Sequence, residues 1–157
     1  MENDFESIVD KYSGKLYGYL MKLLSTHADA EDVLQDVFVS FYAKMAFINS
    51  EKFSSYLFRT AHNKAINHLK KEKRYAPYND FKHAQVSEPQ PDEENKAKKI
   101  RQALKKLKPK ELLAVELQIY QNKSYREIAD IMETTPNAVD SLLVRAKKKL
   151  RIFLQDK

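Results

Sequence analysis

The stretch that most constrains the fold is 124–150, SYREIADIMETTPNAVDSLLVRAKKKL, which predicts two helices joined by a tight turn. Ser124 and Glu127 form the S-x-x-E pattern of a capping box, in which two side chains satisfy free backbone N–H groups of a first helical turn. Further along, Thr135 is a good N-cap residue, and Pro136 suits the first position of a helix, where a missing N–H costs nothing. The sequence therefore predicts that a second helix begins at Pro136.

Apolar residues recur at helical spacing on both sides of the break at Glu133 and Thr134, and they predict the buried faces. They are Ile128, Ala129, Ile131 and Met132 in the first helix, and Val139, Leu142, Leu143, Ala146 and Leu150 in the second. The predicted outer face of the second helix mixes base-reading and phosphate-holding side chains. It comprises Asn137, Asp140, Ser141, Val144, Arg145 and Lys148. A short helix, a polar turn and a longer helix with a basic end are typical of a helix-turn-helix, although an ordinary helical hairpin with a solvated end shares this pattern.

Composition favours an all-α fold. The 157 residues include only two Gly and five Pro, which leaves little material for hairpin turns. No cysteine is present, so disulfides and thiolate zinc sites are excluded. No apolar run is long enough to span a membrane, and the acidic start at Glu2 and Asp4 is unlike a signal peptide. We therefore expect a soluble, cytoplasmic protein without membrane insertion.

The charge is unevenly distributed along the chain. The net charge is +6, but residues 1–76 carry +1, residues 77–95 carry −4 and residues 96–157 carry +9. The middle segment also contains three prolines and lacks periodicity. This pattern predicts two small helical domains, 1–76 and 96–157, joined by a flexible acidic linker at 77–95. The basic second domain makes a polyanionic partner plausible.

Three helices are expected in the first domain, with a loop over residues 43–52. Their ranges are Phe5–Leu24, Asp29–Tyr42 and Phe53–Arg74. The second of these helices has an acidic start and an acidic flank. Acidic residues in a first turn complement the helix dipole, so these carboxylates suit an ordinary solvated helix. They could instead bind a metal or a basic protein surface. No His or Cys stands at ligand spacing on the same face of that helix, so we expect no metal site.

The third helix has aromatic residues near its start, amides in its middle and a basic cluster at its end. This order suits nucleic acid, with bases stacked and phosphates paired, although a basic end also simply complements the helix dipole. In the second domain, helices are expected over 96–107 and again after Lys108 and Pro109, the latter with Leu112, Leu113, Leu117, Ile119 and Tyr120 on its apolar face.

Three segments together resemble the extracytoplasmic-function (ECF) group of bacterial RNA polymerase sigma factors. DAEDVLQDVFVSFY is similar to the family's polymerase-binding helix, and FSSYLFRTAHNKAINHLKKEKR is similar to its promoter-melting and recognition helix. LKPKELLAVELQIYQNKSYREIADIMETTPNAVDSLLVRAKKKL is similar to its carboxy-terminal domain, which reads the upstream promoter element. The three motifs occur in the family's order and cover nearly the whole chain.

The resemblance implies partners and residue roles. The partners are the β′ clamp and β flap of core RNA polymerase, promoter DNA and, in this family, an anti-sigma factor; no cofactor is implied. The residues implied to bind the clamp are Asp29, Glu31, Asp32, Gln35, Asp36 and Phe38. Those implied to bind the minus-10 element are Phe47, Asn49, Phe53, Arg59, Asn63, Asn67, His68, Lys70, Lys71, Lys73 and Arg74, with Phe47, Phe53 and Tyr56 as stacking candidates. Those implied to bind the minus-35 element are Tyr125, Thr134, Thr135, Asn137, Asp140, Ser141, Val144, Arg145 and Lys148.

The sequence departs from the family pattern at four positions. Asp140 and Leu142 stand where the family usually has a basic residue, Val144 where it often has His, and Tyr56 where it often has Trp. Asp140 could accept a hydrogen bond from a cytosine amino group, and Val144 could contact a thymine methyl group. These differences imply a different promoter preference within the same class.

Two other functional classes compete with the sigma factor. A free-standing helix-turn-helix regulator would use the second domain alone, normally as a dimer on a palindrome, and it gives no reason for the acidic helix beside an amide-rich one. A small helical enzyme would need convergent nucleophile, base or metal ligands, and the sequence shows no such set. We therefore expect a protein without catalytic activity of its own.

Overall fold

The structure, a computed structural model, describes residues 4–75 and 92–155, and all regular structure within these ranges is helical. The chain divides into two compact units, Met1–Lys82 and His83–Lys157. The predicted all-α, two-domain fold is thereby confirmed. None of the described helices is both long and apolar enough to cross a membrane.

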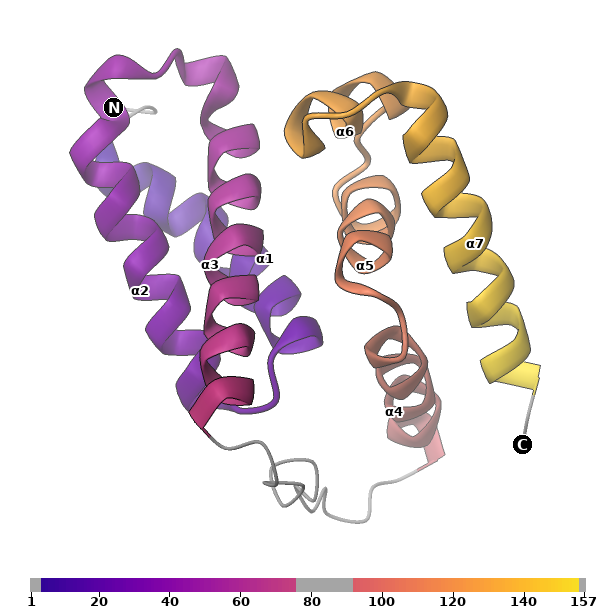
Figure 1. The fold of residues 1–157 in the computed structure, drawn as a ribbon. Helices are drawn as coiled ribbons and strands as arrows, with labels where there is room; N and C mark the ends of the chain where they lie inside the picture. The colour runs from indigo at the N-terminus through magenta and orange to yellow at the C-terminus, as the bar shows by residue number, and fades with distance from the viewer. Residues whose placement is uncertain (1–3, 76–91, 156–157) are drawn as a thin grey trace. The chain divides into compact units, whose positions relative to one another are not determined.

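The first unit contains three long helices, α1 (Phe5–Leu23), α2 (His27–Lys44) and α3 (Phe53–Tyr75), each of which packs against the other two (Figure 1). Aromatic rings fill one end of this bundle. Phe5 stacks on Phe41 with ring centroids 6.3 Å apart, and Phe53 meets Phe41 edge-on at 5.0 Å. Because the three rings come from α1, α2 and α3, one apolar cluster holds all three helices together.

Side-chain caps fix where the first two helices begin. Asp4 accepts a hydrogen bond from the Ser7 backbone N–H at 2.8 Å, and this bond holds the pKa of the Asp4 carboxyl below its usual range. Thr26 accepts one from the Asp29 N–H at 3.1 Å. As a result α2 begins at His27, two residues before the predicted start.

The predicted loop at 43–52 is wrong. Helix α2 continues to Lys44, and two 3₁₀ turns follow, η1 (Met45–Phe47) and η2 (Ser50–Lys52). Only residues 48 and 49, between these turns, have extended backbone angles. The apolar periodicity stops after Tyr42, but this segment contains no Gly or Pro that would end helical conformation.

The second unit contains α4 (Asp92–Lys105), α5 (Pro109–Val115), the π-helical turn η4 (Glu116–Tyr120), α6 (Tyr125–Met132) and α7 (Pro136–Gln155). Helix α7 packs against α4, α5 and α6 (Figure 1). Its core side chains are Val139, Leu143 and Ala146, three members of the predicted apolar stripe. Leu142 and Leu150, also predicted on this stripe, are half-buried.

The predicted apolar face after Pro109 is wrong at its carboxyl end. Ile119 and Tyr120 are exposed, whereas Glu116 is buried. Glu116 lies four residues after buried Leu112 and so on the same helix face. The exposure of Ile119 and Tyr120 follows from the π turn, in which the N–H of Gln121 donates to the carbonyl oxygen of Glu116 at 3.1 Å, five residues back. Each π turn contains an extra residue, so the side chains after it are rotated relative to a regular α-helix.

Both ends of the second unit also differ from expectation. Helix α4 begins at Asp92, so residues 92–95 of the predicted linker are helical, and the rest of the linker lies outside the described residues. Residues 92–95 lack the apolar residues on which the predicted helix boundary depended, but they contain no helix breaker after Pro91. At the other end α7 continues to Gln155, beyond Leu150, where the stretch that predicted this helix ends.

Candidate protein and nucleic-acid interfaces

Helix α2 presents an acidic edge to solvent. Glu31, Asp32, Gln35 and Asp36 are all exposed, as the acidic flank predicts, because the opposite side of the helix is buried through Val33 and Val37. Asp29 differs from its neighbours, since its side chain is largely buried against α3. Carboxylates exposed along two helical turns can attract a basic protein surface without any rearrangement of the helix.

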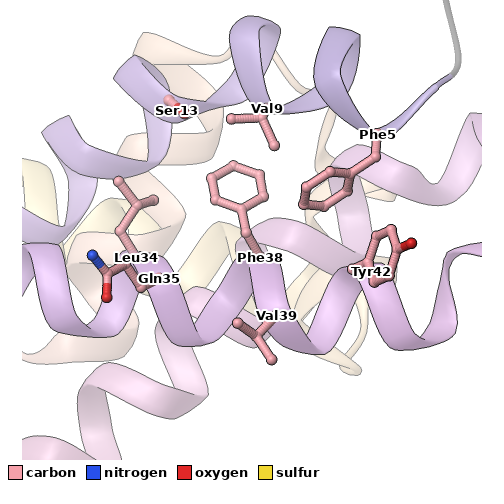
Figure 2. Close-up of a pocket in the computed structure, with 8 residues that line it drawn as sticks. All are labelled: Phe5, Val9, Ser13, Leu34, Gln35, Phe38, Val39 and Tyr42. Carbon is pink, nitrogen blue, oxygen red and sulfur yellow. The ribbon is translucent and has the colours of Figure 1, made fainter.

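An apolar groove of about 660 Å³ lies between α1 and α2, next to this acidic edge (Figure 2). It is lined mainly by Phe5, Val9, Leu34, Phe38, Val39 and Tyr42. Phe38 lies at the centre of the drawn residues and is mostly buried, so it contributes to the floor of the groove. Val39 and Tyr42 are two-thirds exposed large hydrophobic side chains that the sequence did not single out. Together the groove and the acidic edge make a surface suited to a partner with apolar and basic side chains.

Two aromatic residues that were predicted to stack on bases, Phe47 and Phe53, differ in how exposed they are. Phe47 in η1 is 89% exposed, so its ring is available to a partner. Phe53, predicted as a base-stacking residue, is only 5% exposed and packs against Phe41. Phe53 therefore cannot stack on a base while the core is intact, and its predicted contact with DNA is wrong. Tyr56 is half-buried against the same ring.

The outer side of α3 carries the predicted amides and cations. Asn63, Asn67, Lys70, Lys71 and Lys73 are exposed, and Arg59 is partly exposed. Asn49, ahead of the helix, is also exposed, whereas the side chain of Arg74 lies outside the described set. Helix α3 thus brings amides and three lysines to the surface along its second half, an order that suits a nucleic-acid strand with accessible bases and phosphates.

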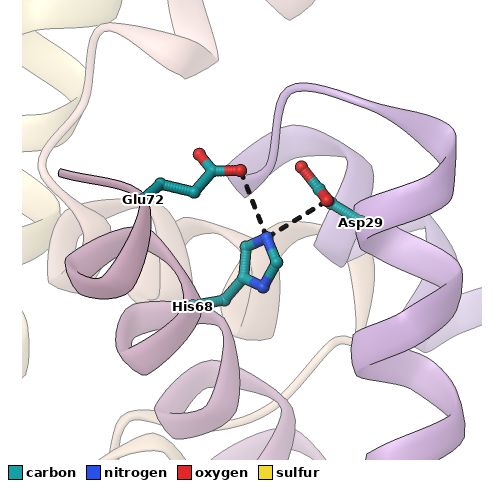
Figure 3. A group of neighbouring side chains, drawn as sticks. All are labelled: Asp29, His68 and Glu72. Carbon is teal, nitrogen blue, oxygen red and sulfur yellow. Dashed lines mark ion pairs between the residues drawn. The ribbon is translucent and has the colours of Figure 1, made fainter. Parts of the chain in front are cut away.

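His68, also expected on this surface, instead faces α2 (Figure 3). Its Nε2 atom lies 3.2 Å from Oδ1 of Asp29 and 3.2 Å from Oε2 of Glu72. The sequence placed Asp29 and His68 in two different interfaces, because neither residue's own helix reveals the other. The signal that could have found part of this cluster is the i,i+4 spacing of His68 and Glu72, which puts both on one helix face.

The helix-turn-helix in the second unit has the predicted caps. The Ser124 N–H donates to Oε1 of Glu127 at 2.8 Å, and the Glu127 N–H donates to Oγ of Ser124 at 3.1 Å. The first of these bonds is the main cause that lowers the pKa of Glu127. Glu133 ends α6 in a left-handed conformation with φ 55°, and Thr135 caps α7 by accepting from the Ala138 N–H at 3.1 Å.

The predicted base-reading face of α7 is open to solvent. Thr134, Thr135, Asn137, Asp140, Ser141, Val144, Arg145 and Lys148 are all exposed, and Tyr125 at the start of α6 is partly exposed. The face contains an acidic, an apolar and several basic or hydroxyl-bearing side chains within four turns. Such a set can contact base edges and phosphates in a major groove.

A buried carboxylate of α5 pairs with two basic side chains of α7. Glu111 of α5 is 1% exposed and receives hydrogen bonds from Nζ of Lys149 at 2.9 and 3.2 Å and from the Lys108 backbone N–H at 2.9 Å. Nε of Arg145 lies 3.8 Å from the same carboxylate. Burial raises the pKa of Glu111, but the hydrogen bonds from Lys149 and Lys108 and their charges outweigh it, so the pKa is lowered overall. Sequence reasoning missed Glu111 because its charged partners, Lys149 and Arg145, lie in another helix.

Each of the two units matches the model of a known protein family. A model described as Sigma-70 region 2 matches residues 8–75, and one described as Sigma-70, region 4 matches residues 97–150. The RNA polymerase sigma-H factor of Pseudomonas aeruginosa is 27% identical over 167 residues, covering 96% of this chain and 86% of that protein. The ECF RNA polymerase sigma factor SigW of Bacillus subtilis is 34% identical over 73 residues, covering 46% of this chain and 39% of that protein.

The fold also has a counterpart among solved structures. The sigma factor RpoE of Bartonella quintana, solved in complex with the anti-sigma factor NepR, superimposes with a TM-score of 0.79. The sequences are 21% identical, and the match covers 100% of this chain and 99% of that one. At this identity the likeness establishes a shared fold.

Proposed function

The chain belongs to the ECF group of the sigma-70 family, and we propose that it works as an alternative sigma factor through three of the surfaces described above. The observation that carries this proposal is the presence of region 2 and region 4, in that order, in one chain. A free-standing helix-turn-helix regulator would account for residues 97–150 but gives no role to residues 8–75. The function is promoter-specific initiation of transcription, with catalysis supplied by the polymerase.

The first proposed surface binds the β′ clamp of core RNA polymerase. It combines the exposed carboxylates of Asp32 and Asp36 with the apolar groove around Phe38. Charged residues at the edge would accelerate and orient docking on the basic clamp, and burial of the groove would supply most of the affinity. Glu31 and Gln35 lie on the same exposed edge and extend this surface.

The second proposed surface holds the minus-10 element in its melted form. Exposed Phe47 is the stacking residue in this proposal, while Asn49, Asn63 and Asn67 offer amide hydrogen bonds to bases. Flipping a base costs a few kcal/mol, which stacking and hydrogen bonds must offset. Lys70, Lys71, Lys73 and Arg74 would hold phosphates along the second half of α3, and Arg59 would do so in its first half.

The third proposed surface is the exposed face of α7, which would enter the major groove at the minus-35 element. Asn137, Ser141 and Arg145 would contact base edges or phosphates, while Asp140 would accept from a cytosine amino group and Val144 would contact a thymine methyl group. Tyr125, Thr134, Thr135 and Lys148 would contact the backbone around this site. The buried Glu111 holds Lys149 and Arg145 on one side of α7, which supports a fixed orientation of the reading face.

The remaining partners follow from the same proposal. Residues 1–76 and 96–157 would act as two promoter-binding domains, the second of which would also contact the β flap, and the acidic segment 77–95 would enter a basic channel of the polymerase. The chain would also bind an anti-sigma factor. Because polymerase and chromosome are cytoplasmic in bacteria, this is where the chain would work.

Binding to core polymerase tests this function. The purified full-length chain is mixed with bacterial core RNA polymerase and separated by size-exclusion chromatography. Co-elution at one chain per polymerase is expected. If the chain never co-elutes but binds duplex DNA, the regulator replaces the sigma factor as the function.

A further inference from the structure

Three potential metal ligands converge where the carboxyl-terminal half of α3 packs against the start of α2 (Figure 3). Asp29 comes from α2, and His68 and Glu72 come from consecutive turns of α3. One ligand atom of each lies within 4.8 Å of the other two. The side chains are 23–27% exposed, so the cluster is sheltered but within reach of solvent ions.

The two carboxylates approach the same imidazole nitrogen without a directed hydrogen bond. Nε2 of His68 is 3.2 Å from an oxygen of each carboxylate, yet this buried atom has no hydrogen-bond partner among the described residues. A ring N–H aimed at one carboxylate would form a hydrogen bond at this distance. The ring nitrogen thus lies close to both carboxylate oxygens without a hydrogen bond to either, an arrangement that three ligands of one cation also have.

The spacing fits a shared ion. Zinc is bound by histidine nitrogen at about 2.0–2.1 Å and by carboxylate oxygen at about 2.0–2.2 Å, so two ligands of one ion lie about 3.0 Å apart in octahedral and about 3.4 Å apart in tetrahedral coordination. The observed distance of 3.2 Å for both nitrogen–oxygen pairs lies between these two values. Two of the three ligand pairs therefore already have the spacing of ligands that share one ion, and the two carboxylate oxygens lie within 4.8 Å of each other.

We propose that Asp29, His68 and Glu72 form a binding site for a divalent first-row transition metal, with Zn²⁺ as the preferred ion. Two carboxylates supply two negative charges that the ion neutralises, and the imidazole selects transition metals over Mg²⁺ and Ca²⁺. Water fills the remaining coordination positions. The ion joins α2 to α3 and thus stabilises the first unit by binding its folded state only.

The test uses the full-length chain without a polyhistidine tag, freed of metal by a chelator. Isothermal titration calorimetry with Zn²⁺ is expected to show one tight site, whereas Mg²⁺ is expected to bind at least about tenfold more weakly. Zn²⁺ is also expected to raise the thermal unfolding midpoint. The variants H68Q, D29N and E72Q are each expected to weaken Zn²⁺ binding by at least about tenfold and to lose the rise in the midpoint.

A matched control is available in the first turn of α2. His27 is exposed and pairs with Glu31 at 3.4 Å, outside the cluster, so H27Q should bind Zn²⁺ as the unmodified chain does. Circular dichroism of each metal-free variant shows whether it is folded. If H68Q does not fold, the ¹⁵N resonance of the His68 Nε2 atom in the unmodified chain gives the same information, because Zn²⁺ must shift it. Unchanged binding in folded H68Q, an unshifted Nε2 resonance, or an absence of Zn²⁺ binding would overturn the proposal in favour of a pair of carboxylates around a protonated imidazole.

Discussion

Lys149 of α7 donates to both carboxylate oxygens of Glu111 of α5, at 2.9 and 3.2 Å, across 38 positions of sequence. Glu111 is buried, so its charge depends on Lys149, the Lys108 N–H and Arg145 for compensation. The Lys149–Glu111 pair joins the carboxyl-terminal half of α7, the proposed DNA-reading helix, to the core of its own unit. The stability of this unit and its capacity to bind DNA should therefore both depend on it.

Substitution of Lys149 by Met should destabilise the second unit by about 1–3 kcal/mol, because hydrogen bonds to a buried charge are lost while the lysine itself is partly exposed. Urea unfolding monitored by circular dichroism measures this. The matched control K148M removes the same charge at an exposed neighbour and should change the free energy of unfolding by less than about 0.5 kcal/mol. Equal effects of the two substitutions would show that the Glu111 pair does not stabilise the unit.

Glu111 should also make stability depend on pH. Its pKa in the fold lies below the ordinary value of 4.5, so the folded chain binds this proton more weakly than the unfolded chain does. The stabilisation is therefore complete above the ordinary pKa and is lost as pH falls through the lowered one. Glu127 also has a lowered pKa and makes stability depend on pH in the same direction. The contribution of Glu111 is therefore measured as the difference between the unmodified chain and E111Q. The free energy of unfolding should fall less steeply below pH 4.5 in E111Q than in the unmodified chain, and parallel curves would contradict this.

Phe47 and Phe53 should respond in opposite ways to substitution by Ala. F53A removes a buried ring and should cost about 3–5 kcal/mol of stability, whereas F47A should change stability by less than about 0.5 kcal/mol. F47A should instead reduce promoter opening, measured as permanganate reactivity of unpaired thymines, because a stacking contact is worth about 1–3 kcal/mol per base. Normal opening by F47A would remove this residue from the proposed minus-10 surface.

Reversal of Asp32 and Asp36 to Lys should abolish association with core polymerase while leaving the helical circular dichroism spectrum unchanged, since both side chains are exposed. The control reverses Glu6 and Asp10, two exposed carboxylates of α1, with the same change of net charge. Retained binding in the control and lost binding in the first variant would localise the docking surface to α2. Equal loss in both would indicate a general effect of charge.

Arg145 and Lys148 should differ in how they affect DNA binding. R145A should weaken binding to the upstream element by about 1–3 kcal/mol and relax its sequence preference if the guanidinium reads a base edge. K148A should weaken binding to all sequences about equally and reduce its salt dependence, as expected for a phosphate contact. Fluorescence anisotropy at several salt concentrations separates these outcomes. Unchanged binding by R145A would mean that α7 does not enter the groove as proposed.

Local signals in the sequence were enough to place most of the helices. The capping box at Ser124 and Glu127 and the N-cap at Thr135 were readable because each involves residues three apart. The buried stripe through Val139, Leu143 and Ala146 followed from helical periodicity alone. Exposure of the acidic edge of α2 was predicted in the same way.

Contacts between distant segments were not predictable from such patterns. Phe47 and Phe53 look equivalent in sequence, and only the packing of Phe53 on Phe41 distinguishes them. The π turn at Glu116 depends on a hydrogen bond that no residue pattern marked. The meeting of Asp29 with His68 depends on how α2 and α3 pack, so neither helix alone could reveal it.

The most direct test of the central claim is run-off transcription with the purified chain, bacterial core RNA polymerase and a library of promoter sequences. The account predicts transcripts from a restricted set of templates that share two elements, and none from core polymerase alone. The double reversal at Asp32 and Asp36 should abolish them. Selective binding to duplex DNA without any transcript from the library would contradict assignment of the chain as a sigma factor.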